Sequence, residues 1–68
     1  MANSIYEHSA ELIFSIVESI DDSLKILISN FVKKNGPTVF LNNIEQFDLP
    51  FDIHMKLQSL RQFVKYLD

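Results

Sequence analysis

Cysteine is absent from this chain, and its 68 residues include only one glycine and two prolines. Without cysteine, neither a disulfide framework nor a thiolate metal site can stabilise so short a sequence. With a single glycine, a glycine-rich phosphate loop is excluded, and so is a nucleophile elbow. The stability of the protein must therefore come from the packing of ordinary side chains.

Positive charge is also scarce, and no basic residue precedes Lys25. Nine acidic residues against six basic ones give a net charge of −3 and a pI near 5.1. Such a chain lacks the excess of Lys and Arg that neutralises phosphates, so direct nucleic-acid binding is not expected. The early sequence also lacks the positive charge of a targeting signal. Its most apolar window, residues 12–32, holds four charged side chains, which excludes a membrane span. We therefore expect a cytoplasmic protein.

A seven-residue repeat of apolar side chains predicts a helix over residues 4–34. Ser4 and Glu7 have the spacing of a capping box, and Gly36 and Pro37 form a stop signal. Such a helix is about 46 Å long at 1.5 Å per residue, whereas a compact chain of this length is roughly 28 Å across. The alternative is a break at residues 20–22, with Ser19 or Asp21 as the cap of a new helix. We favour the continuous helix because the repeat crosses this point in register.

Two further amphipathic helices are predicted after Pro37. The first covers residues 38–47, and the second begins after Pro50, with apolar residues at Ile53, Leu57, Leu60, Val64 and Leu67. Hydrophobic residues make up 47% of the chain and charged residues 22%, which is typical of a folded domain.

The predicted architecture is all-α: a single helical domain over residues 1–68 that forms a small bundle of three to four helices. It has a long N-terminal helix, a short middle helix and a C-terminal helix. The apolar stripes exceed what one copy can cover, so we expect dimerisation to complete the bundle. The expected oligomer seam consists of Ile13, Val17, Ile20, Leu24, Leu27 and Phe31.

No pattern of residues indicates catalysis, a cofactor or a metal site. The two histidines, His8 and His54, do not repeat the Glu-x-x-His motif of di-iron helical proteins, because Phe51 stands three residues before His54. The tripeptide 22–24 (Asp-Ser-Leu) resembles the attachment site of acyl carrier proteins, in which the serine carries phosphopantetheine. Carriers place a long loop before that serine, whereas Ser23 here follows a helical pattern with almost no loop.

The function predicted from these features is that of a small non-enzymatic regulator that binds a partner protein and inhibits it. Antirepressors, antitoxins and adaptors are small, acidic and helical in this way. Acidic residues would complement the basic surface of a transcription repressor or another DNA-binding protein, and aromatic residues would anchor the contact. The expected contact residues are Glu7, Glu11, Glu18, Asp21 and Asp22, with the rings of Tyr6, Phe14, Phe40 and Phe51.

The alternative prediction is a small helix-turn-helix-like regulator that binds DNA through its C-terminal helix. Lys56, Arg61 and Lys65 would then reach the DNA. Against this reading, the turn before that helix contains Pro50 where such motifs often have glycine.

Overall fold

The computed structural model describes the backbone of residues 2–67 and the side chains of residues 8–65. Within this part of the chain all regular structure is helical, which confirms the predicted all-α class. The elements in order are α1 (Ala2–Ile16), the 3₁₀ turn η1 (Val17–Ser19), α2 (Asp22–Asn35), α3 (Pro37–Leu41), the 3₁₀ turn η2 (Ile44–Gln46) and α4 (Phe51–Leu67).

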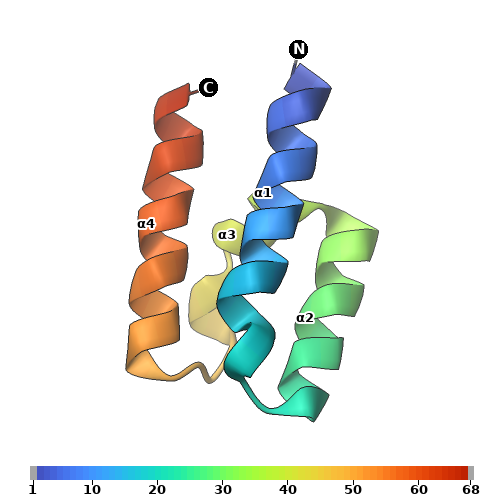
Figure 1. Ribbon diagram of the computed structural model, residues 1–68, viewed down its shortest axis with the longest axis vertical. Helices are drawn as coiled ribbons and strands as arrows, with labels where there is room; N and C mark the ends of the chain where they lie inside the picture. The colour runs from blue at the N-terminus through green and yellow to red at the C-terminus, as the bar shows by residue number, and fades with distance from the viewer. Residues whose placement is uncertain (1, 68) are drawn as a thin grey trace.

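The short helix α3 lies at the centre of the helix packing (Figure 1). It packs against α1, α2 and α4, and α1 also packs directly against α4. In the view of Figure 1, α1 lies between α4 and α2, and the start of α1 and the end of α4 lie at the same end of the molecule. The chain measures 33 × 22 × 18 Å, with a radius of gyration of 11.1 Å.

The prediction of one continuous helix over residues 4–34 is wrong, because the chain turns between α1 and α2. Ile20 is extended, with φ −83° and ψ 173°, and its N–H donates to the Val17 carbonyl. Asp21 then caps α2 by accepting a hydrogen bond from the Ser23 backbone N–H at 3.2 Å. A straight helix of about 46 Å would exceed the longest dimension of the molecule, 33 Å. The predicted alternative, a break with Asp21 as the cap, is confirmed.

The other helix boundaries follow the sequence signals in part. Helix α1 begins at Ala2, so Ser4 lies inside the helix and is not its cap. Helix α2 ends at Asn35, directly before the predicted stop at Gly36, whose φ of 94° is in the region that glycine tolerates. Pro37 then begins α3, which ends at Leu41, earlier than the predicted helix over residues 38–47.

The core lies where the four helices face one another. Phe40 is completely buried, and its ring contacts those of Phe31 and Phe47, with centroids 6.1 and 5.3 Å apart. The predicted apolar row of α4 faces this core; Leu67, its last member, lies outside the described side chains. The buried hydrophobic residues are Ile13, Val17, Ile20, Ile28, Val32, Phe40, Leu41, Ile44, Ile53, Leu57, Leu60 and Val64.

Candidate functional site

The surface of this small protein carries many large apolar side chains. Single exposed apolar residues are normal on any protein, but residues grouped on one face of a helix mark an interaction site. In the described part of the chain, the exposed large hydrophobic residues are Leu12, Phe14, Ile26, Leu27, Val39, Phe51, Met55 and Phe63.

Helix α4 brings three of these residues to one side. Phe51 is 78% exposed, Met55 45% and Phe63 59%. At roughly 100° per residue they lie within an arc of about 120°, on the side of α4 opposite the buried row. The same arc holds the exposed Asp52, Ser59 and Gln62. We call this surface the α4 outer face: Phe51, Asp52, Met55, Ser59, Gln62 and Phe63.

Three of the four aromatic residues predicted as contact anchors have described side chains, and these three lie on different helices, α1, α3 and α4. Phe51 is exposed on the α4 outer face, and Phe14 is partly exposed, at 36%, on α1. The prediction for Phe40 fails, because its ring is enclosed by the core and cannot reach a partner. Tyr6 lies outside the described side chains, as does the acidic residue Glu7. The sequence already contained the signal for Phe40, because its spacing with Ile44 and Phe47 places it on the inner face of a helix.

The four predicted acidic residues with described side chains fall into two places. Glu11 is exposed on α1, more than one helical turn before η1. Glu18, Asp21 and Asp22 lie exposed where the chain turns between α1 and α2. Lys25 also faces this turn: its Nζ donates to the Glu18 carbonyl at 3.1 Å and lies 3.5 Å from Asp22 Oδ1. We call Glu18, Asp21 and Asp22 the acidic turn.

Two side chains of the acidic turn, Asp21 and Asp22, also interact with neighbouring residues of α2. The Ser23 hydroxyl and then the Ser23 backbone N–H donate hydrogen bonds to Asp21, which lowers the pKa of its carboxyl below the ordinary value of 3.8. Asp22 pairs with Lys25 in an exposed ion pair of the kind that contributes little stability. The serine of the Asp-Ser-Leu tripeptide is thus part of a helix cap.

The predicted oligomer seam does not form one stripe, because the turn at residue 20 places its two halves on different helices. Ile13, Val17 and Ile20 are buried in the core of a single copy. Leu24 and Phe31 are half-buried against that core, and only Leu27 is exposed, at 55%. The exposed large apolar residues of the described chain therefore lie mainly outside this predicted seam, and three of them share the α4 outer face.

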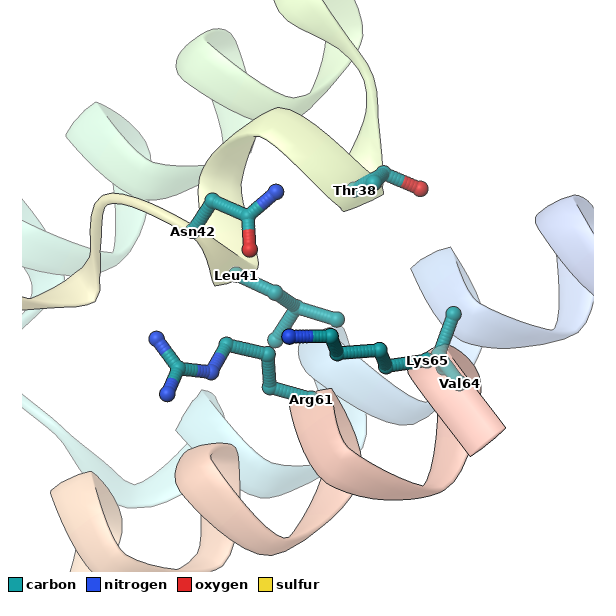
Figure 2. Close-up of a pocket in the computed structure, with 6 residues that line it drawn as sticks. All are labelled: Thr38, Leu41, Asn42, Arg61, Val64 and Lys65. Carbon is teal, nitrogen blue, oxygen red and sulfur yellow. The ribbon is translucent and has the colours of Figure 1, made fainter. Parts of the chain in front are cut away.

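The basic residues of α4 point in different directions. Lys56 lies about 140° around the helix from Arg61 and about 180° from Lys65. Arg61 and Lys65, one turn apart, line a pocket of about 250 Å³ between α3 and α4, together with Thr38, Leu41, Asn42 and Val64 (Figure 2). The three cations therefore do not form one basic face for a DNA groove, and α3, which would precede the recognition helix, has only five residues.

The described residues offer no cluster of three or more His, Asp or Glu side chains placed to hold a metal ion. His8 is exposed on α1 and His54 is half-buried on α4. Among the helices of residues 2–67, none has the length and apolar character needed to cross a membrane.

Comparison with known proteins adds no relative: no protein family, curated protein or solved structure matches this chain. Any functional conclusion therefore rests on the surface just described.

Proposed function

We propose that this protein is a small non-enzymatic regulator that acts by binding a partner protein and inhibiting it, in the manner of antirepressors, antitoxins and adaptors. The observation that carries the proposal is the exposure of Phe51, at 78%, one turn before Met55 on the α4 outer face. Burying such a ring against a partner stabilises the complex by about 1.5–3 kcal/mol. Exposed aromatic residues of this kind are typical anchors of protein interfaces.

The chemistry of the proposed partner follows from the charge of the molecule. The net charge is −3, and Glu18, Asp21 and Asp22 are exposed at one turn. A basic protein surface, such as that of a transcription repressor or another DNA-binding protein, complements this charge. Opposite charges speed the encounter, and the apolar residues then slow dissociation. A cytoplasmic location is part of the proposal.

The proposal also includes a homodimer in the absence of the partner. Two copies that pack their α4 outer faces together would cover Phe51, Met55 and Phe63, and the four helices of each would form half of a larger bundle. A symmetric contact of this kind uses the same residues from both copies, so a partner that binds this face would compete with dimerisation.

The test is affinity capture from the native host with three forms of the protein. The first is the wild type and the second carries Phe51→Ser and Met55→Ser on the α4 outer face. The third carries Ile26→Ser, which removes an exposed apolar residue from α2 and serves as the matched control. We expect a partner that wild type and control retain and the double variant loses. That purified partner should bind its own target less well in the presence of the wild-type protein.

Two results would contradict the proposal. One is capture of the same proteins by all three forms, which would mean that the α4 outer face takes no part in binding. The other is DNA binding by the purified protein in a mobility-shift assay, weakened steeply by salt and lost on Lys56→Ala and Arg61→Ala. That second result would establish the DNA-binding alternative.

A further inference from the structure

The pocket between α3 and α4 has features that the proposed function does not use. Its volume is about 250 Å³, and it lies on a different side of α4 from the outer face. Figure 2 shows Thr38 and Asn42 on the α3 side and Arg61 and Lys65 on the α4 side. Lys65 extends back along α4 toward Arg61, so the two cations lie on the same side of the pocket.

These two cations have no counterion in the described part of the chain. The ion pair found there joins Lys25 to Asp22, in the first turn of α2. Like charges four residues apart on a helix repel each other, and no carboxylate among the described side chains, residues 8–65, pairs with either of them. The carbonyl groups at the end of α4 favour Lys65, which lies in its last turn, but they do not account for Arg61 one turn earlier.

The α3 side of the pocket adds neutral hydrogen-bonding groups. Neither the Thr38 hydroxyl nor the Asn42 side-chain amide bonds to another described residue, although the Asn42 backbone N–H donates to the Thr38 carbonyl at 3.1 Å. The neighbouring Asn43, by contrast, donates its amide N–H to the Val39 carbonyl at 2.7 Å. Four side chains with hydrogen-bonding capacity that is not used internally therefore border one small space, whose apolar wall is formed by Leu41 and Val64.

We propose that this pocket is a binding site for a small phosphomonoester. A phosphomonoester carries a charge of about −1.5 to −2 at neutral pH, which matches the two cations, whereas a single carboxylate would leave one of them unpaired. The planar guanidinium of Arg61 suits bidentate contact with two phosphate oxygens, and Lys65 supplies a second point charge. The wall formed by Leu41 and Val64 accommodates the carbon part of the ester.

The test is a titration of ¹⁵N-labelled protein, followed by amide chemical shifts, at constant ionic strength. The ligands are inorganic phosphate, phenyl phosphate and benzoate. We expect saturable shifts in residues 38–42 and 61–65, with phenyl phosphate binding more tightly than inorganic phosphate because its ring contacts the apolar wall. Benzoate, which has the ring but a single charge, should bind more weakly than phenyl phosphate.

Substitutions decide whether the binding is specific. Arg61→Gln and Lys65→Gln should each weaken phenyl phosphate binding by about tenfold or more, the effect of losing a hydrogen bond to a charged group. Lys56→Gln removes the same charge from another side of α4, and it should leave the affinity unchanged. The same spectra report whether each variant is folded. Arg61→Lys keeps the positive charge but removes the planar guanidinium, so this variant should bind phenyl phosphate with intermediate affinity.

The proposal is overturned if phosphate moves amides near Lys33, Lys34 and Lys56 as strongly as those of the pocket, because binding would then be general attraction to positive charge. Equal affinity of Arg61→Gln and Lys56→Gln would also overturn it. Neither result would bear on the α4 outer face, so this proposal and the proposed function fail independently.

Discussion

Phenylalanine side chains illustrate how strongly the role of a residue depends on its place in this protein. Phe40 and Phe51 were both predicted as contact anchors, yet one is completely buried and the other is the most exposed large apolar residue described. Phe40 is surrounded because α3 packs against three helices. Phe51 begins α4 and lies on the side away from the buried row, so its ring remains in water.

We predict that alanine at these two positions changes the stability of the fold by very different amounts. Phe40→Ala should cost about 3–5 kcal/mol through the cavity and the lost ring contacts with Phe31 and Phe47. That loss is comparable to the roughly 3–5 kcal/mol that a single core supplies in a domain of this size, so the variant should be largely unfolded. Phe51→Ala should change stability by less than about 0.5 kcal/mol. Urea unfolding followed by circular dichroism measures both, and equal effects would contradict the structure.

The cap at Asp21 gives a second prediction. Asp21→Ala should lower the melting temperature by about 5 °C, because the Ser23 backbone N–H loses its acceptor at the start of α2. Asp22→Ala is the matched control, since Asp22 is also exposed and makes only a surface ion pair. It should have a much smaller effect. A larger loss from Asp22→Ala would mean that Asp21 is not the cap.

The same cap should make stability depend on pH in a defined direction. The pKa of Asp21 is lower in the folded protein than its unfolded value of 3.8. Its contribution is therefore fully present above that pH and is lost as the pH falls through the lower, folded pKa. The difference in stability between wild type and Asp21→Ala should narrow in strong acid. A difference that stays constant below pH 3.8 would rule out the charged cap.

At the scale of the elements, the sequence predicted where helices occur and which faces are buried better than it predicted how long each helix is. The end of α2, the position of Pro37 in the next helix and the inner row of α4 were all readable, because glycine, proline and apolar spacing act locally. The break before Asp21 was not favoured, although its cap was recognised. Both halves of the repeat face the same core, so the apolar spacing continues through the turn without marking it.

The junction between α2 and α3 provides the element-scale prediction. Gly36 has φ 94° and ψ 159°, a backbone region that is essentially restricted to glycine, and it is buried. Gly36→Ala should destabilise the protein by about 1–3 kcal/mol, because alanine is strained in this conformation. Asn35→Ala, which replaces the exposed residue next to it, is the control. Similar unfolding midpoints for the two variants would show that the glycine conformation is not required.

At the scale of the whole molecule, the expectation that apolar surface exceeds what one copy covers stays a prediction, and the sequence did not indicate where the exposed apolar residues lie. The core of one copy takes up Ile13, Val17 and Ile20, half of the predicted seam. The exposed large hydrophobic residues of the described chain are spread over four helices. That three of them share one face of α4 becomes visible only when it is known which side of α4 packs against the core. The pocket between α3 and α4 was missed for a similar reason, because it requires two segments about twenty residues apart in the chain.

The proposed homodimer leads to a prediction about concentration. If two copies associate through the α4 outer face, the melting temperature should rise with protein concentration, because association stabilises the folded state. In the variant with Phe51→Ser and Met55→Ser this dependence should disappear, whereas Ile26→Ser should retain it. Light scattering coupled to size-exclusion chromatography gives the mass directly. A monomeric wild type at all concentrations would contradict the homodimer.

The central place of α3 also has a consequence for how the protein is made on the ribosome. Helices α1, α2 and α3 emerge first, but Phe40 and Leu41 are enclosed only after α4 has packed against them. Until α4 has emerged and packed, these two side chains lack the contacts that bury them.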